Sequence, residues 1–231
     1  MKRIGIIGAM RVEVESLKML CTDARSMTLS GMEFTQGSLF GQDVVLAVSG
    51  VGKVSAAVCT QAMILRFAPD CIINTGVAGG IGAGLRLMDV VVGTKVAQHD
   101  MDTSALGEPV GLISGLDRVF MDCDEGLSSA ICRAAELVGA APRRGLIVSG
   151  DQFIASVEQI ARIHKNFPEA MAAEMEGASI GQVCAMNGTP FAVIRAISDG
   201  GDEGASMDFP EFVRRSAERS IDILRAFLQA R

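Results

Sequence analysis

The sequence predicts an α/β fold in one domain, built on a mixed β-sheet with helices on both faces. Short runs of β-branched residues alternate with longer stretches whose apolar residues recur at helical spacing. The chain has 231 residues, a length that single α/β domains commonly reach. We therefore expect one domain over residues 1–231, large enough to bury its own core without disulfides or metal ions.

Six runs have the composition of buried strands. In chain order they are residues 3–8, 43–49, 70–75, 89–97, 144–149 and 189–198. Strands that alternate with helices are typical of a largely parallel sheet covered on both faces. Residues 32–40 differ, because they alternate apolar with polar side chains and lead through Gly41 and Gln42 into the second run. This pattern predicts an antiparallel hairpin at the edge of the sheet, which makes the sheet mixed.

Helix starts can be placed from their first residues. Asp124 stands before an apolar series at helical spacing, and Ser156 with Gln159 resembles a capping box. Asp208 with Glu211 has the same spacing and opens the last predicted helix.

Charge and composition exclude several classes of function. The formal net charge is −6 and the pI is about 5.0, so the chain would repel the phosphates that dominate nucleic-acid affinity. No apolar run approaches the length of a membrane span. The cysteines are scattered without a CxxC pair, which favours the reduced thiols of a cytoplasmic protein. A hydrophobic content of 49% and a mean hydropathy of +0.35 favour a homo-oligomer.

Two glycine-rich segments invite a phosphate-binding interpretation, and neither fits one. The first segment, residues 49–58, contains GVGK, which resembles the end of a Walker motif. The first glycine of that motif would fall at position 47, where this chain has Ala47, and Val54 replaces the Ser or Thr. The second segment is residues 74–84. If Gly80 and Gly82 are taken as the first two glycines of the dinucleotide fingerprint, the third would fall at position 85, where this chain has Leu85. These glycines either form strand-to-helix turns or let the backbone approach a ligand closely.

Metal and serine-nucleophile chemistry are also poorly supported. His99 and His164 are the only histidines, and neither has a cysteine or histidine at ligand spacing. Ser149 lies in SGD rather than in GxSxG. Residues 99–122 show no periodicity, and a loop of this length in a compact domain is usually functional or disordered. We expect no metal ion and no cofactor.

Three carboxylates on separate segments form the strongest candidate site. Glu13, Glu176 and Asp199 each follow a predicted strand or open a helix, so the fold can bring them to one cleft. Each also has an ordinary explanation: a first helical turn for Glu13, a turn before Gly-Gly for Asp199, and a helix start for Glu176. Glu174 lies two residues before Glu176, and we expect only one of the two to face the cleft.

Seven segments spread from residue 4 to residue 199 together carry a family resemblance. They are GIIGAM with its following acidic residue, SGVGKV, INTGVAGG, HDMD, RGLIVSGDQFI, EMEGASI and RAISD. In this order they resemble the 5′-methylthioadenosine/S-adenosylhomocysteine nucleosidases of the nucleoside phosphorylase-like superfamily. The resemblance implies a three-layer α/β/α domain with a central mixed sheet, a homodimer, and irreversible hydrolysis of the bond between adenine and a 5′-thio-substituted ribose.

The resemblance also implies roles for individual residues. Asp199 would be the general acid at adenine N7. Glu13 would activate the attacking water with Arg195 nearby, and Glu176 would accept hydrogen bonds from the ribose hydroxyls. Around them, Phe153 would stack on adenine and the Ile154 backbone would read its edge. The other residues implied in substrate binding are Met10, Val51, Ala78, Gly79, Leu106 from the partner subunit, Met175, Ser198 and Phe209.

Two alternatives stay open. One is a purine nucleoside phosphorylase on the same fold, although the Glu13 carboxylate would oppose a bound phosphate. The other is a nucleoside-binding domain without catalysis, which fold alone does not exclude. The preferred substrate is also open, because Val77 stands where many relatives carry Ser, and the chain has no Tyr or Trp.

Overall fold

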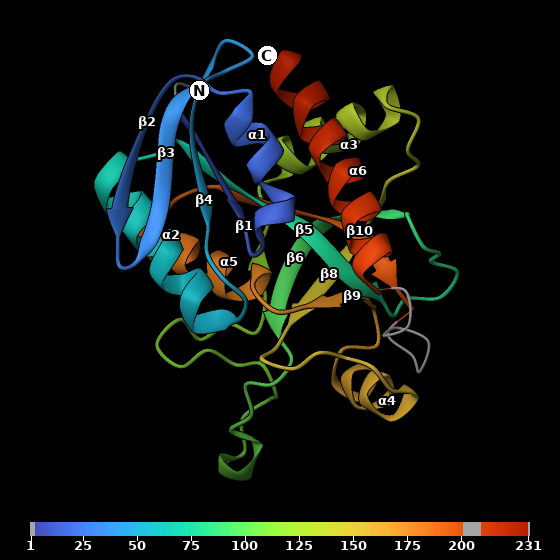
Figure 1. Ribbon diagram of the computed structural model, residues 1–231. Helices are drawn as coiled ribbons and strands as arrows, with labels where there is room; N and C mark the ends of the chain where they lie inside the picture. Colours follow the sequence, from blue (N-terminus) through green and yellow to red (C-terminus); the bar gives the residue numbers. More distant parts are fainter. Residues whose placement is uncertain (1–2, 201–208, 231) are drawn as a thin grey trace.

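The computed structural model describes residues 3–200 and 209–230, without the side chains of residues 209 and 210. The described strands form one ten-stranded mixed sheet with helices on both faces, which confirms the predicted fold class (Figure 1). The strands are β1 Arg3–Gly8, β2 Thr22–Leu29, β3 Met32–Leu39, β4 Gln42–Val48, β5 Cys71–Gly80, β6 Val90–Gln98, β7 Met121–Asp122, β8 Arg143–Ser149, β9 Ala170–Glu174 and β10 Phe191–Asp199. The helices are η1 Arg11–Glu13, α1 Glu15–Met19, α2 Lys53–Phe67, η2 Ser104–Leu106, α3 Glu125–Leu137, α4 Val157–Asn166, α5 Gly177–Asn187 and α6 Phe209–Gln229.

The sheet runs in the order β10-β6-β8-β9-β5-β1-β4-β3-β2, and β7 pairs with β6. β10 also pairs with β5, so five strands close into a ring: β5, β9, β8, β6 and β10. Within the ring, β5 is parallel to β10 and antiparallel to β9. The carboxyl ends of β1, β5 and β10 therefore lie together at one end of the sheet.

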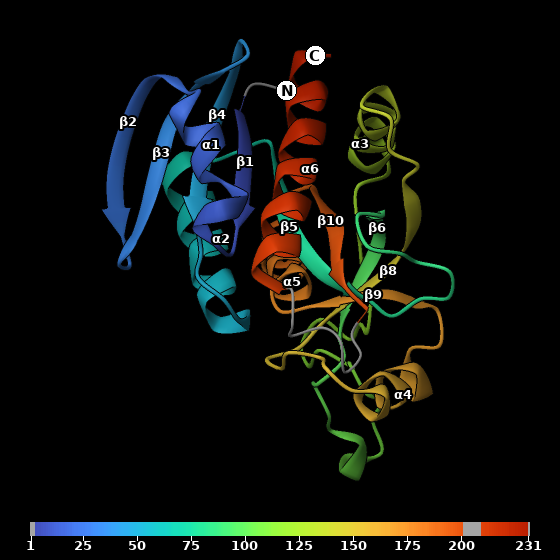
Figure 2. The ribbon, with the colours of Figure 1, turned by 45° about the vertical axis from the view of Figure 1, so that its right-hand side comes forward.

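Apolar side chains hold the helices to the two faces. One core cluster joins α1, α3 and α6 to the sheet, and Figure 2 shows α3 and α6 side by side. A second cluster joins α2 and α5 to the opposite face. A smaller cluster lies under α4. These clusters make three layers, because each helix buries one apolar stripe and the sheet buries both faces. No helix in the described part of the chain is both long and apolar enough to cross a bilayer.

Local predictions from the sequence can now be compared with the elements. The hairpin of residues 32–40 is confirmed as β3 and β4, but its predicted place at the edge is wrong, because β2 pairs with the outer side of β3 and is itself the edge strand. Asp124 caps α3 by accepting a hydrogen bond from the Leu127 N–H, and Ser156 caps α4. Asp208 lies outside the described residues.

The two glycine-rich segments differ in conformation. Residues 49–52 join β4 to α2 in a tight turn in which Gly52 has a φ of +99°, as expected of a strand-to-helix connection. For residues 74–84 the turn interpretation is wrong. β5 continues through Gly80, because pairing with β10 and β9 on its two sides keeps the glycine-rich half extended.

Candidate active site

A cavity of about 330 Å³ opens at the carboxyl ends of β1, β5 and β10, where open α/β sheets bind their ligands. It contains all three of the predicted carboxylates, Glu13, Glu176 and Asp199. Its lining residues are Ala9, Met10, Glu13, Val51, Val77, Ala78, Gly79, Gln152, Phe153, Ile154, Ala173, Glu174, Met175, Glu176, Ser198 and Asp199.

Glu13 is held at the end of η1 by the backbone around it. Its Oε2 accepts hydrogen bonds from the N–H groups of Ala9 at 2.7 Å and Met10 at 2.8 Å. Its Oε1 accepts one from the Val77 N–H at 3.1 Å. Burial raises the pKa of Glu13, while these hydrogen bonds and the positive charge of Arg195 act in the opposite direction. A carboxyl with a raised pKa is suited to take a proton near neutral pH.

Gly76 lets Glu13 lie against β5. A Cβ at this position would stand 2.5 Å from Glu13 Oε1, so no larger residue fits without moving the carboxylate. Of the two explanations for the glycines of this segment, close backbone approach therefore applies at Gly76, where the group approached is a carboxylate of the protein itself.

Glu174 is a site residue that the sequence reasoning missed. It ends β9 rather than opening a helix, and it is among the residues that line the cavity, although its side chain is only 2% exposed and is paired with Arg195. Glu174 pairs with the buried Arg195, accepts from the Ser149 hydroxyl, and accepts from the Gly177 N–H at 2.8 Å. Burial would raise the pKa of Glu174, but the charge of Arg195 and these hydrogen bonds hold it below its ordinary value.

Glu176 lies just before α5 and is 6% exposed. Its Oε1 accepts a hydrogen bond from the Gly52 N–H at 2.9 Å, across from the start of α2. Burial and then the negative charge of Glu174 raise the pKa of Glu176 to about 8. Glu174 and Glu176 therefore differ in protonation at neutral pH, and the former is the one that stays ionised.

Asp199 and Ser198 both line the cavity, although they are neighbours on one strand. Adjacent strand residues normally point to opposite faces. Here the pairing of β10 with β5 shifts between Ile197 and Asp199, which is a β-bulge at Ser198. The bulge turns both side chains to the same side. The Ser198 hydroxyl donates a hydrogen bond of 2.9 Å to Asp199 Oδ2.

Phe153 and Ile154 enter the cavity from the loop that follows β8. Phe153 is 47% exposed and Ile154 is buried. The loop is tied to two other elements, because the Asp151 N–H donates to Asp100 Oδ2 and Asp151 Oδ1 accepts from the Lys53 N–H. The Lys53 ammonium also contacts Asp100 Oδ1 at 2.6 Å. We call Lys53, Asp100 and Asp151 the loop clamp.

Two of the residues implied in binding, Arg195 and Leu106, do not line this cavity among the described residues, and the side chain of a third, Phe209, is not described. Arg195 lies behind the cavity, 1% exposed, against Glu174. Leu106 is 81% exposed in η2, and Figures 1 and 2 show its loop extending away from the body of the molecule. Phe209 is the first residue of α6, and its side chain lies outside the described part of the structure.

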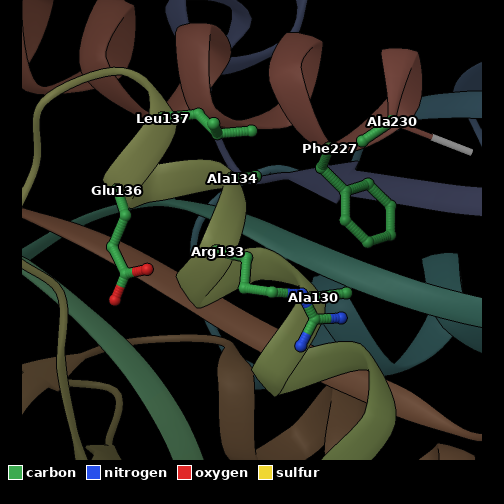
Figure 3. Close-up of a pocket in the computed structure, with 7 residues that line it drawn as sticks. All are labelled: Ala130, Arg133, Ala134, Glu136, Leu137, Phe227 and Ala230. Carbon is green, nitrogen blue, oxygen red and sulfur yellow. The ribbon is translucent and has the colours of Figure 1, made fainter.

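A second hollow, of about 570 Å³, lies between α3 and α6 (Figure 3). Its lining residues are Ala130, Arg133, Ala134, Glu136, Leu137, Phe227 and Ala230. No pair of carboxylates converges among them, so acid–base chemistry is assigned to the first cavity. Within the described residues, no three side chains of His, Cys, Asp or Glu are arranged to hold a metal ion.

Comparison with known proteins decides the family. The family model of the phosphorylase superfamily matches residues 3–229. A 5′-methylthioadenosine/S-adenosylhomocysteine nucleosidase of Haemophilus influenzae (strain 86-028NP) is 43% identical over 218 residues, which cover 94% of each chain. The chain belongs to the 5′-methylthioadenosine/S-adenosylhomocysteine nucleosidase family.

Solved structures of this nucleosidase family and of a neighbouring hydrolase share the fold. The Neisseria meningitidis nucleosidase, solved in complex with methylthio-immucillin-A, is 43% identical and has a TM-score of 0.96 over 100% of both chains. The futalosine hydrolase of Helicobacter pylori strain 26695 is 35% identical and has a TM-score of 0.94, over 100% of this chain and 98% of its own.

Proposed function

We propose that this chain hydrolyses the N-glycosidic bond of 5′-methylthioadenosine and S-adenosylhomocysteine, and that residues 1–231 act as one catalytic domain. The observation that carries the proposal is the convergence of Glu13, Glu176 and Asp199 in one cavity. The family membership supports the same reaction, since the relatives named above carry it in their names.

Asp199 serves as the general acid. Cleavage of the bond develops positive charge on the ribose and pushes electrons onto the leaving base, which departs readily only when protonated. Asp199 delivers this proton to adenine N7. The Ser198 hydroxyl donates a hydrogen bond to Asp199 Oδ2, and both residues are nearly fully buried.

Glu13 activates the attacking water. Three backbone N–H groups fix its carboxylate in the wall of the cavity. Arg195 acts from behind the cavity, where its charge lowers the pKa of Glu13 and so opposes the effect of burial. A carboxylate at this position repels an anionic nucleophile and accepts a proton from a neutral one, which favours hydrolysis over phosphorolysis.

The remaining residues grip the substrate. Glu176 binds the ribose 2′- and 3′-hydroxyls, and Met175 packs on the ribose. Phe153 stacks on adenine while the Ile154 backbone reads its edge. The other residues to which we assign contacts with the nucleoside are Met10, Val51, Ala78, Gly79, Ser198 and Phe209.

The active form is a homodimer in which the partner's Leu106 completes the 5′ side of the site. Exposed apolar side chains support this assembly: Val54 is 74% exposed and Leu65 is 76% exposed on α2, and Leu106 extends from its loop. Surfaces of this kind are usually covered by a partner. The cysteines are all unpaired, which fits a reducing compartment, and we place the protein in the cytoplasm.

The test is release of adenine from both nucleosides in phosphate-free buffer. Asp199→Asn and Glu13→Gln are each expected to lower kcat by roughly 100-fold or more, as the loss of a general acid or base does. Full turnover in either variant would remove that residue from the mechanism. A strict requirement for phosphate would instead identify a phosphorylase, and kcat/KM for 5′-deoxyadenosine and futalosine would rank the substrates.

A further inference from the structure

Arg195 is a buried cation that interacts electrostatically with several carboxylates. Arg195 is 1% exposed, and its positive charge acts on Glu174, Glu176 and Glu13. A guanidinium has a rigid planar fork, so its effect on each carboxylate depends on where the fork is held. The pair with Glu174 alone does not fix this orientation, since a single contact leaves the plane free to turn.

Asn74 supplies two of the four contacts that hold this orientation. It lies in β5 and is 1% exposed. Its Oδ1 accepts from Arg195 Nη2, the same nitrogen that contacts Glu174, and its backbone carbonyl accepts from Arg195 Nη1 at 3.4 Å. The Ile194 carbonyl accepts from Nη1 at 3.0 Å. Two nitrogens of the fork are therefore anchored on β5 and β10.

The amide of Asn74 is itself held in one orientation. Its Nδ2 donates a 3.0 Å hydrogen bond to the Ile7 carbonyl in β1. Because one end of the amide must donate, the other end presents its oxygen to Arg195. Ile7 lies two residues before Ala9, whose N–H binds Glu13. Asn74 thus connects the strand that anchors Glu13 to the cation that faces it.

We propose that Asn74 is a positioning residue, which holds the Arg195 guanidinium at the place where it acts on the water-activating Glu13. The inference rests on the proposed function for its effect on turnover. Asn74 is absent from the cavity lining and so acts through Arg195 rather than on substrate.

The charges around Glu13 determine the direction in which its pKa should move when Asn74 is replaced. Arg195 lowers the pKa of Glu13, so a guanidinium that is no longer held there lets this pKa rise. A base with a higher pKa becomes protonated, and therefore inactive, at a higher pH. The acid limb of the kcat/KM profile should then move to higher pH. Among the described residues, the ionisable groups that line the cavity with Glu13 are Asp199 from β10 and Glu174 and Glu176 from the β9–α5 junction. Arg11 and Glu15 flank Glu13 on its own segment, and β5 presents the uncharged Val77 to it. α6 packs against η1, and its Ser220 hydroxyl donates to the Gly76 carbonyl of β5.

The experiment compares Asn74→Leu and Asn74→Ser with the full-length wild type. Two properties are measured against pH: kcat/KM for 5′-methylthioadenosine, and the side-chain carboxyl ¹³C shift of Glu13 in the free protein, assigned with Glu13→Gln. We expect the acid limb and the Glu13 titration to move up by about one pH unit in both variants. Asn74→Ser keeps the test valid if the larger side chain prevents folding.

Ser128→Ala is the matched control. It removes a buried side-chain hydrogen bond, to the Gly93 carbonyl at 3.0 Å, that has no connection to Arg195. Its melting temperature should fall while its titration stays that of the wild type. Unshifted Glu13 titrations in both Asn74 variants would overturn the proposal, whatever their stability. A wild type that titrates normally but releases no adenine would overturn the proposed function instead, and the ¹³C titrations would still decide the role of Asn74.

Discussion

Burial and a neighbouring negative charge together set the protonation state of Glu176. Glu174 takes the available cation and the hydroxyl of Ser149, and its negative charge then raises the pKa of Glu176. At neutral pH the buried pair therefore carries one proton, on Glu176. In this state Glu176 has a donor as well as an acceptor for two ribose hydroxyls.

This pKa predicts a pH-dependent stability. In the unfolded chain Glu176 ionises near its ordinary value of 4.5, whereas in the folded protein it ionises near 8. The folded state therefore loses stability as the pH rises between these two values, and the loss levels off above the second. Glu176→Gln cannot ionise, so its free energy of unfolding relative to the wild type should increase from pH 4.5 to pH 8. Urea unfolding at a series of pH values measures this, and a difference independent of pH would contradict it.

The loop clamp connects three elements: the start of α2, the segment after β6 and the loop after β8. Asp100 is its centre, because it binds both the Lys53 ammonium and the Asp151 N–H. Burial acts to raise the pKa of Asp100, but these two contacts hold it below its ordinary value. The clamp thus holds the loop that carries Phe153 and Ile154, the proposed adenine contacts.

Asp100→Asn is expected to raise KM about tenfold while kcat changes less than about threefold, because uniform binding is lost and the chemistry is not. Steady-state kinetics on 5′-methylthioadenosine measure the two values. The control is Glu125→Gln, which breaks the exposed pair with Arg144 away from the cavity. A fall in kcat with an unchanged KM would show that the clamp acts on the chemical step instead.

The elements also show how far the sequence predicts this structure. Strands with continuous apolar runs, such as β6, are found directly, and so are helices with a capping residue such as Asp124. β2 is missed because most of its residues are exposed, so it lacks an apolar alternation. The glycine-rich half of β5 is strand only because β9 and β10 pair with it, which local propensity cannot reveal.

Some residues of the site can also be predicted from the sequence, and others cannot. Glu13, Glu176 and Asp199 follow from the segments that carry the family resemblance, and the cavity brings them together. Glu174 is missed because its role depends on Arg195, which lies 21 positions away in the chain and on another strand. Such a contact exists only in the folded chain, where tertiary packing brings the two strands together.

At the scale of the whole molecule, the exposed apolar face of α2 predicts a dimer. The wild type should have twice the 24.2 kDa mass of the chain in light scattering. Val54→Asp combined with Leu65→Asp places two charges on this face and should give the single mass. If Leu106 of the partner subunit completes the site as proposed, KM should also rise. Leu137→Asp, on α3 and 74% exposed, is the control. A wild type of single mass would contradict the assembly.

The closed ring of strands has a consequence for how copies of the chain meet. Each strand within the ring is paired on both sides. At the opposite end of the sheet order stands β2, which is paired on one side only, with β3. An unpaired flank of this kind can recruit a foreign strand and begin aggregation. Charged Asp23 and Arg25, together with a bulge between Thr22 and Arg25, make this edge a poor partner for another strand. β2 also lies several strands away from the ring in the sheet order.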